Sequence, residues 1–312
     1  MRAASVLLCL LACAKPPAVE TRPPPPSPPG GLESFERIQI GGVLRGISGL
    51  ARREDGRLLV VPERERQAYF LDLNARTLDP PAGFAIEGVP EGVDLESAAF
   101  ELEQVVLGTE GKDERGQDLL LFAKLSADKL SVTRSLPLSY ANFGGVAEGN
   151  HGLEGLCAVP GQILAISETL EERGATRLAP LFIIQTGTDR VSTHRVKLLT
   201  ERGKLSGLAC RRIEQGVEVV GIERHFETSR LVYFQLPKEG GPEVIEPTEL
   251  LDVARLFEGD PPNFEGVEIL GERRLLLSSD NDYGGVKGPT ELLLLTLSPD
   301  PAGGGFRTGG QP

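Results

Sequence analysis

A two-part pattern occurs five times along this chain of 312 residues. Each copy begins with a Glu or Ser before a small residue and a short apolar run. About fifteen residues later, a second apolar run ends on an acidic residue. The first members of the pairs lie 48, 58, 52 and 59 residues apart. Repeats of about fifty residues built of short strands are typical of a β-propeller, with one blade per repeat. The five pairs are Ser48 and Glu63, Glu96 and Glu110, Glu154 and Glu168, Ser206 and Glu223, and Glu265 and Asp280.

The midpoints of the pairs indicate that each pair forms the two ends of an antiparallel hairpin. Two midpoints fall on the turn-forming residues Asp55-Gly56 and Gly161, and two fall beside Gln215-Gly216 and Gly271-Glu272, whereas the midpoint of the second pair is Glu103. In such hairpins both members of a pair lie at the same end of their blade. Because the inner strands of a propeller face its central channel, the pattern predicts eight acids and two serines around one mouth of that channel.

We therefore predict an all-β protein with a β-propeller fold. Five blades are favoured, and a sixth blade within 64–95 or 111–150 is the alternative. The fifth repeat lacks an outer strand, whereas the strand expected at 35–40 has no blade of its own. The strand at 35–40 should therefore complete the last blade and close the ring, which removes an exposed sheet edge. The run 249–257 predicts a short helix, and 243–246 an outer strand of the fourth blade.

Composition limits the classes of partner. The net charge is −12, with 33 basic and 45 acidic residues. Nucleic acids and anionic lipids both require a basic face, so the composition argues against either as a partner. Apolar residues make up 40% of the chain, but there is no Trp and aromatics are only 5%. We expect a monomer with an aliphatic core.

The N-terminal segment has the features of a bacterial export signal. Arg2 is followed by an apolar stretch that is too short to span a bilayer as a helix. Leu10-Leu11-Ala12 before Cys13 resembles a lipobox, which implies cleavage before Cys13 and lipid attachment to it; an ordinary secretory leader is the alternative. The predicted organisation is a signal peptide (1–12), a lipidated cysteine with a proline-rich linker (13–33), a propeller domain (34–297) and a disordered tail (298–312). The protein should be lipid-anchored in the bacterial cell envelope, at the periplasmic or outer-membrane face.

Two further cysteines lie in the inner strands of neighbouring repeats. Cys157 is three residues past the first member of its pair, and Cys210 is four residues past its own. Strand alternation then sends the two side chains to opposite faces of their sheets. We expect two buried free thiols, although an extracytoplasmic location permits a disulfide.

Several short segments around four of the five pairs occur in a fixed order along the chain. They are Ser48 to Leu50 with Val60 to Arg64, Asn150 to Leu156 with Ser167-Glu168, Leu205 to Leu208 with Ile222 to Arg224, and Asn263 to Val267 with Ser278 to Asp282. Taken together, these segments resemble the phytase-like family, also described as esterase-like activity of phytase. The resemblance extends over most of 41–297, and it implies a secreted or periplasmic propeller with a site at the channel mouth. The second repeat departs from the usual Glu-Gly because it has Glu96-Ser97.

The acidic ring is the main candidate site. Clustered carboxylates raise one another's pKa and are stable only beside cations or arginines. A hard cation such as Ca²⁺ takes six to eight oxygen ligands, which converging carboxylates can supply. The alternative is architectural, because a residue repeated five times often caps strands or bonds to the next blade. The candidate metal ligands are Glu96, Glu154, Glu168, Glu223, Glu265 and Asp280.

Two histidines flank members of the ring. His151 lies three residues before Glu154, and His225 lies two residues after Glu223. In a propeller both fall at the same mouth, where they are a candidate general acid and base. The alternative is a pair of polar loop histidines.

These features leave two hypotheses about function. The first is a metal-assisted hydrolase of phosphate or carboxylic esters, with a small-molecule ester as substrate. The second is a non-catalytic lipoprotein that binds an envelope ligand or partner at the same mouth. Both predict contact with a membrane through the lipid anchor only.

Overall fold

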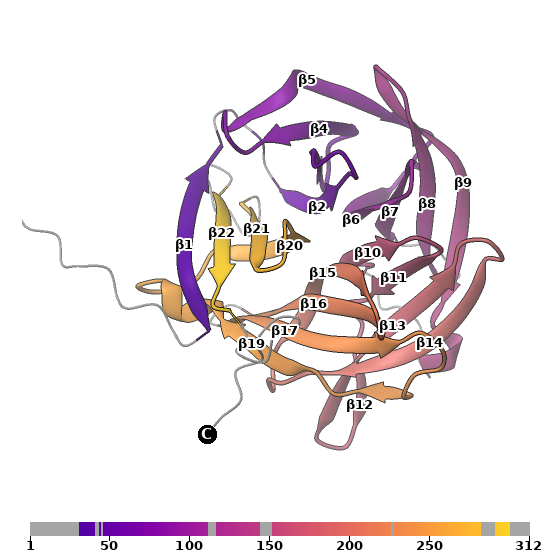
Figure 1. Ribbon diagram of the computed structural model, residues 1–312. Coiled ribbons are helices and arrows are strands. Elements are labelled where there is room, and N and C mark those ends of the chain that lie inside the picture. The colour runs from indigo at the N-terminus through magenta and orange to yellow at the C-terminus, as the bar shows by residue number, and fades with distance from the viewer. Residues whose placement is uncertain are drawn as a thin grey trace, which may run out of the picture.

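The computed structural model describes residues 31–40, 44, 46–111, 117–143, 152–225, 228–281 and 291–299. The described chain is almost entirely β-strand, with two short 3-10 helices, η1 (Tyr140–Phe143) and η2 (Val253–Leu256). The strands surround a common axis, which confirms the predicted all-β propeller (Figure 1). Among the described residues, no helix has the length and apolar character needed to cross a membrane.

The described strands group into five antiparallel units of four strands each, numbered here along the chain. Unit 1 contains β2 (Ile47–Arg52), β3 (Leu58–Pro62), β4 (Gln67–Asp72) and β5 (Thr77–Glu87). Unit 2 contains β6 (Val93–Glu101), β7 (Gln104–Gly111), β8 (Gln117–Leu125) and β9 (Lys129–Ser139). Unit 3 contains β10 (Gly155–Val159), β11 (Gln162–Ile166), β13 (Thr176–Gln185) and β14 (Arg190–Lys197), with the short β12 (Glu171–Arg173) beside β13. Unit 4 contains β15 (Lys204–Ile213), β16 (Gly216–His225), β17 (Thr228–Pro237) and β19 (Thr248–Asp252). Unit 5 contains β20 (Asn263–Ile269), β21 (Arg274–Asp280), β22 (Glu291–Leu297) and β1 (Leu32–Gln39).

The innermost strands of the units contact one another in a closed cycle. β2 contacts β6, β6 contacts β10, β10 contacts β15, β15 contacts β20, and β20 returns to β2. Five buried hydrophobic clusters lie between neighbouring units, and each combines side chains from two of them. The cluster between units 3 and 4, for example, joins Leu164 and Ile166 to Val217 and Val219. Each unit is thus buried on both faces, so its inner strands read as continuous apolar runs.

The first strand of the described chain closes the ring, as predicted. β1 pairs antiparallel with β22 along its whole length, from Leu32 opposite Leu297 to Gln39 opposite Glu291. It is therefore the outer strand of unit 5, although more than two hundred residues separate it from that unit. The hydrogen bonds of β22 are thereby satisfied, and the last unit is completed by the beginning of the domain.

The outer parts of the units test three sequence-based expectations, and two of them differ from the structure. The predicted helix at 249–257 is wrong, because its first half forms β19 and only Val253–Leu256 makes a 3-10 turn. Pairing with β17 overrides the helical pattern there. The strand expected at 243–246 exists as β18 (Val244–Ile245), but it pairs in parallel with β14 of unit 3 rather than within unit 4. The described parts of 64–95 and 111–150 supply outer strands of units 1 and 2, not a further sheet.

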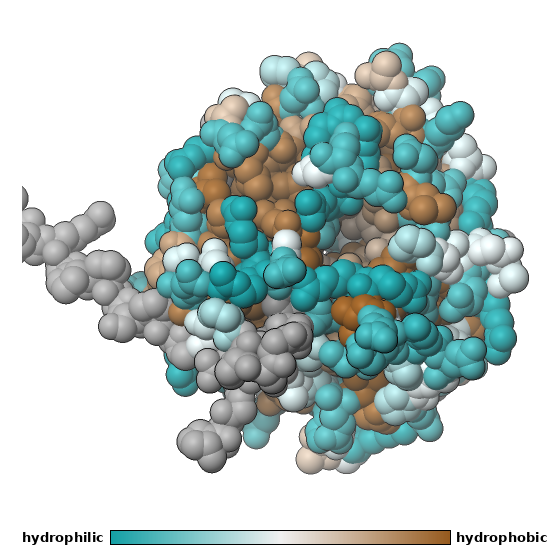
Figure 2. Space-filling view, in the orientation of Figure 1, coloured by the Kyte–Doolittle hydropathy of each residue, from teal (hydrophilic) through white to brown (hydrophobic). Residues whose placement is uncertain are grey.

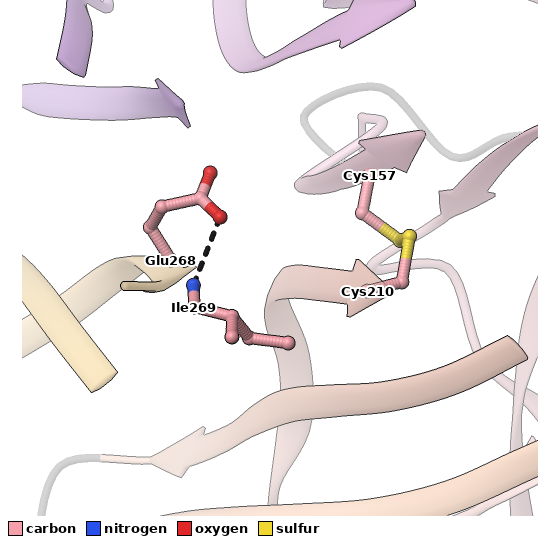
Figure 3. The surroundings of a disulfide bond; sticks show 4 residues. All are labelled: Cys157, Cys210, Glu268 and Ile269. Carbon is pink, nitrogen blue, oxygen red and sulfur yellow. Dashed lines mark hydrogen bonds between the residues drawn. A yellow bond between two sulfur atoms is a disulfide. The ribbon is translucent and has the colours of Figure 1, made fainter. Parts of the chain in front are cut away.

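A disulfide joins the innermost strands of units 3 and 4, which corrects the expectation of two buried free thiols. Cys157 of β10 and Cys210 of β15 are bonded, with 5.6 Å between their Cα atoms (Figure 3). The two cysteine side chains do lie on opposite faces of their own sheets, as strand alternation predicts, but this arrangement brings them together instead of keeping them apart. One face of each unit looks back to the preceding unit and the other looks forward. Side chains that meet between units must therefore lie on opposite faces of their own sheets.

The glycine after the first member of each pair has a steric role. A Cβ atom on Gly155 would lie 2.9 Å from the backbone carbon of Gly207 in the next unit. A Cβ atom on Gly207 would overlap the carbonyl oxygen of Glu265 in the unit after that. In unit 2 the glycine is replaced by Ser97, whose hydroxyl donates to the carbonyl oxygen of Leu153. Small residues at this position thus let the inner strands converge near the axis.

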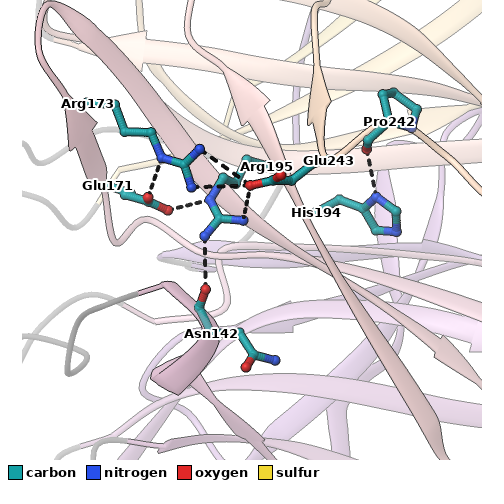
Figure 4. Close-up of polar contacts among 7 residues, drawn as sticks. All are labelled: Asn142, Glu171, Arg173, His194, Arg195, Pro242 and Glu243. Carbon is teal, nitrogen blue, oxygen red and sulfur yellow. Dashed lines mark hydrogen bonds and ion pairs between the residues drawn. The ribbon is translucent and has the colours of Figure 1, made fainter.

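The outer rim of unit 3 is held by a polar network (Figure 4). The Arg195 guanidinium donates to Glu171 of β12, to Glu243 at 3.3 Å and to the carbonyl oxygen of Asn142 at 2.9 Å. It also lies 5.0 Å from the ring centre of Phe143. Because these groups satisfy one another, we assign the network to structure.

Hydrophilic side chains cover much of the face seen in Figure 1, with hydrophobic residues between them (Figure 2).

Replacing Gly207 with Ala should destabilise the protein by about 1–3 kcal/mol, because the added methyl group forces the inner strands apart. Urea denaturation of the purified protein measures the effect. Gly271→Ala is the matched control, since a Cβ there meets nothing within 4 Å. Equal midpoints for the two variants would contradict the close-approach argument.

Replacing Cys157 with Ser should lower the free energy of unfolding by about 2–4 kcal/mol, because the disulfide closes a loop with a sequence separation of 53. Cys210→Ser should have a similar effect. The double variant should be no worse than either single one, since both remove one bond. Additive losses would indicate that the two sulfur atoms are not bonded to each other.

Candidate functional site

The first member of each pair occupies an irregular position at the inner edge of its unit. The strand registers shift at Ser48, Glu96, Ser206 and Glu265, so each is left out of the pairing with the next strand. In unit 3, Glu154 directly precedes β10. A β-bulge of this kind redirects a side chain and bends the strand. All five side chains are buried.

The second members lie at the same end of the units, which confirms the hairpin prediction. Glu110 pairs with Asp94, and Asp280 pairs with Asn263. The Glu63 amide donates to the carbonyl oxygen of Gly46 at 2.8 Å, and the Glu168 amide donates to that of Gly152 at 3.1 Å. The turn of the second hairpin, which contains no glycine, is made by Leu102 in a left-handed conformation with φ 54°.

Eight acids interact electrostatically at this end of the channel, and we call this group the acid mouth. Burial raises the pKa of Glu96 and of Glu154 well above the ordinary value, and neighbouring carboxylates add to the effect. Burial also raises the pKa of Glu110 to about 7, with Glu168 and Asp94 as further causes. The acid mouth consists of Glu63, Asp94, Glu96, Glu110, Glu154, Glu168, Glu265 and Asp280.

The half of the acid mouth formed by units 3 to 5 contains its own cations. Arg224 donates to the Glu265 carboxylate, and Lys204 lies 2.8 Å from a Glu168 carboxylate oxygen. Asn263 also donates to Glu265, at 2.9 Å, and more distantly to Asp280 at 3.4 Å. Burial still raises the pKa of Glu265 to about 7, although Arg224 opposes the shift. These partners stabilise this half of the cluster without any added ion.

The half formed by units 1 and 2 contains a set of three carboxylates that suits a metal ion. One oxygen from each of Glu63, Asp94 and Glu96 lies within 4.8 Å of the others. The Oε1 atom of Glu96, whose residue is only 5% exposed, has no hydrogen-bond partner among the described residues. Within this set, Glu63 pairs with Arg64 at 3.1 Å, but the Arg64 side chain is 63% exposed. Hard cations prefer such carboxylate oxygens, so the residues fit Ca²⁺ or a similar ion.

Glu223, a predicted metal ligand, has a different environment. Its carboxylate accepts hydrogen bonds from the backbone amides of Leu199 and Thr200, at 2.9 and 2.8 Å, and from the Thr200 hydroxyl. These bonds hold the loop that leads into β15. Both oxygens are engaged in structure, so Glu223 does not belong to the acid mouth. Ser206, which stands where units 2, 3 and 5 have Glu, donates to the carbonyl oxygen of Phe264 at 3.3 Å.

The predicted histidine pair is only half described. His151 lies outside the described residues. His225 is the last residue of β16 and pairs with Thr228 of β17. Alternation along the strand sends its side chain to the face opposite that of Arg224. The idea that both histidines serve one site stays a prediction.

Two residues of the mouth, Asp94 and Arg224, do not belong to the five pairs that the sequence pattern predicts. Asp94 lies two positions before Glu96, so alternation along a strand would already place both on one face. Arg224 directly follows Glu223 in the sequence, and in the structure it is a partly buried cation of the mouth. Its partner Glu265 comes from unit 5, and no local pattern predicts a pairing between units.

Without divalent cations, the stability of the protein should fall as the pH rises from about 5 to about 8. Glu110 and Glu265 keep their protons up to about pH 7 in the folded state and lose them earlier when unfolded. The folded state therefore binds more protons across this interval, so raising the pH favours unfolding. Unfolding midpoints in chelator at pH 5, 6, 7 and 8 measure this. Glu265→Gln should flatten the profile, and a flat wild-type profile would contradict the prediction.

Comparisons with solved structures give matches of low sequence identity that extend over most of this chain. Among solved structures, a thermostable family-43 glycoside hydrolase superposes with a TM-score of 0.50 at 10% identity, covering 87% of this chain and 99% of its own. The PQQ-bound aldose sugar dehydrogenase of Streptomyces coelicolor gives 0.48 at 16% identity, covering 87% and 100%. A putative oxidoreductase (glucose dehydrogenase) from Thermus thermophilus gives 0.47 at 13% identity, covering 84% and 100%. At these identities, the similarity concerns the fold alone.

A search of curated protein sequences finds no match. The model of one protein family, Phytase-like, described as esterase-like activity of phytase, matches residues 43–283. The matched region begins just before β2 and extends past β21, so it contains both members of all five pairs. The chain therefore belongs to the Phytase-like family.

Proposed function

We propose that this protein is an exported, metal-assisted hydrolase that cleaves phosphate or carboxylic esters at the acid mouth. The observation that carries the proposal is the set of carboxylates from Glu63, Asp94 and Glu96, together with the unpartnered buried oxygen of Glu96. A buried carboxylate oxygen without a partner is costly, and a bound cation would remove that cost. Family membership agrees with an ester-cleaving activity.

The two halves of the mouth explain where the cation would bind. Units 3 to 5 have Arg224 and Lys204 as internal counter-ions. Units 1 and 2 bring Glu63, Asp94 and Glu96 together, and the one ion pair that these three acids make within the described part of the chain is with Arg64, which is 63% exposed. Coulombic repulsion is therefore least compensated in units 1 and 2, so an added divalent cation gains most there. Ca²⁺ is the cation we expect, because every candidate ligand is an oxygen atom.

Several residues of the mouth have properties that hydrolysis requires. A bound divalent cation would polarise the ester and activate water. Glu110 and Glu265, each with a pKa of about 7, can hold or release a proton near neutral pH. His151 and His225 are the other candidates for moving protons. The remaining acids of the mouth add negative charge around the site but are not ligands of the proposed cation. They are Glu154, Glu168 and Asp280.

The location proposed from the leader is supported by the disulfide. The bond between Cys157 and Cys210 is typical of proteins that fold in an oxidising compartment. Together with the lipobox-like segment before Cys13, it favours a lipid-anchored protein of the bacterial cell envelope. Globomycin treatment of the producing cells, which blocks cleavage of lipoprotein signals, tests this part of the proposal.

A non-catalytic role is the second candidate, and one observation favours it. Part of the ring is engaged in structure, as the clamp made by Glu223 and the pair of Lys204 and Glu168 illustrate. A mouth with this arrangement can bind a ligand through its cation without cleaving it. Metal binding and turnover must therefore be measured separately.

Adding Ca²⁺ to chelator-treated protein should raise the melting temperature by several degrees, because the ion binds the folded state only. Glu96→Gln should abolish this shift and should itself stabilise the metal-free protein at pH 8, since it removes a buried charge. Glu103→Gln is the matched control, because Glu103 is exposed at the opposite end of the same hairpin. Calorimetry provides both readouts.

The same samples are then tested with 4-nitrophenyl phosphate and 4-nitrophenyl acetate. Calcium-dependent turnover that Glu96→Gln reduces at least a hundredfold would support the hydrolase. A calcium shift without turnover of either ester would support the binding role instead. Full turnover in a Glu154→Gln and Glu265→Gln double variant would indicate that the acid mouth is not the site.

A further inference from the structure

Arg224 is a partly buried cation with unused hydrogen-bonding capacity. Its Nη2 atom donates to Glu265, but its buried Nε atom has no partner among the described residues. The side chain is 21% exposed, so it is within reach of a ligand at the mouth. Carboxylates surround it, because Glu154, Glu168, Glu265 and Asp280 all act on its charge. A guanidinium offers five N–H donors in a planar fork, and one neighbouring carboxylate cannot use all of them.

Arg224 and the carboxylates of Glu63, Asp94 and Glu96 are neighbours in the mouth without being paired. Glu154 and Glu265 act electrostatically on both Glu96 and Arg224, so the two groups share the same acidic neighbours. The mouth thus has a buried acceptor without a donor, Glu96 Oε1, and a buried donor without an acceptor, Arg224 Nε. Since neither satisfies the other, a single ligand assembly that satisfies both must present a cation to one and an oxyanion to the other.

We propose that Arg224 is a specificity-determining residue that binds the oxyanion of the substrate or product, beside a cation held by Glu63, Asp94 and Glu96. This inference rests on the proposed function, because it places the anionic group at the same mouth. The recognised chemistry is a phosphate or carboxylate group, as in the acid products of the two classes of ester. Bidentate binding of such groups is what the planar guanidinium favours.

The charge balance of the mouth fixes the order of binding. Among the residues that the structure describes, eight acids of the mouth interact with the basic residues Arg64, Lys204 and Arg224, so a free oxyanion is repelled. A divalent cation reduces this excess and attracts the anion directly. Phosphate or acetate should therefore bind the cation-loaded protein and not the cation-free protein. A counter-ion with a purely structural role would require no such order.

The test is isothermal titration calorimetry on the mature full-length protein. Inorganic phosphate and sodium acetate are titrated separately, with saturating Ca²⁺ and again with chelator. Wild-type protein should bind one of the two anions in the presence of Ca²⁺ only. Arg224→Gln should lower the affinity for that anion at least tenfold. Its affinity for Ca²⁺ should be unchanged or higher, because a positive charge has been removed from the mouth.

Two variants complete the design. Arg224→Lys keeps the charge and loses the planar fork, so its affinity for the anion should lie between those of wild type and Arg224→Gln; it carries the test if Arg224→Gln does not fold. Arg230→Gln is the control, because Arg230 belongs to the same unit but pairs with Glu249. Tighter binding of phosphate would identify phosphate esters as the substrate class, and tighter binding of acetate would identify carboxylic esters.

The outcomes separate this inference from the proposed function. If wild-type protein takes up no Ca²⁺, the proposed function fails, and the inference fails with it. If Ca²⁺ binds but neither anion does, or if Arg224→Gln and Arg230→Gln bind the anion equally well, only the inference is overturned. Anion binding that is as strong in chelator as in Ca²⁺ would also overturn it.

Discussion

The convergence of five inner strands on one axis is the constraint on which the rest of the structure depends. Backbones approach so closely that Gly155 and Gly207 have no room for a side chain beyond hydrogen, and Ser97 fits by donating to the next unit. Larger residues would separate the units and open the five hydrophobic clusters between them. The paired motif of the sequence is thus a packing requirement, repeated because each unit meets the same neighbour geometry.

The same convergence creates the chemistry of the mouth. In units 1, 2, 4 and 5, a bulge just before the close approach directs a polar side chain inward. Glu154 takes the same place in unit 3. Carboxylates that would be independent on a flat sheet are thereby forced together and desolvated, which raises the pKa of Glu96, Glu110, Glu154 and Glu265. Units 3 to 5 relieve this with Arg224 and Lys204, whereas units 1 and 2 leave a set of oxygens suited to a cation. The asymmetry between the halves turns a repeated architectural element into a candidate site.

Local patterns predicted much of this architecture because hairpins are local. The turn residues at Asp55-Gly56 and Gly161, and the apolar runs on both sides of them, specify adjacent antiparallel strands within a few residues. The helix expected at 249–257 failed for the opposite reason. Its apolar spacing suits a helix, but the exposed edge of β17 recruits the first half as β19. Outer strands are decided by such edges, and β18 likewise joined the neighbouring unit rather than its own.

The sequence by itself determined the repeat, the hairpins, the closing strand and the gathering of acids at one end of the channel. These follow from side-chain alternation and turn chemistry, which act over a few residues. Only the tertiary structure decided that Cys157 bonds to Cys210, that Arg224 serves Glu265, that Glu223 clamps a loop, and that Asp94 joins Glu63 and Glu96. The first, second and fourth of these pairings cross from one unit to the next. How the units rotate and pack around the axis decides which side chains meet across a boundary between units. The sequence alone does not give the distances between such residues.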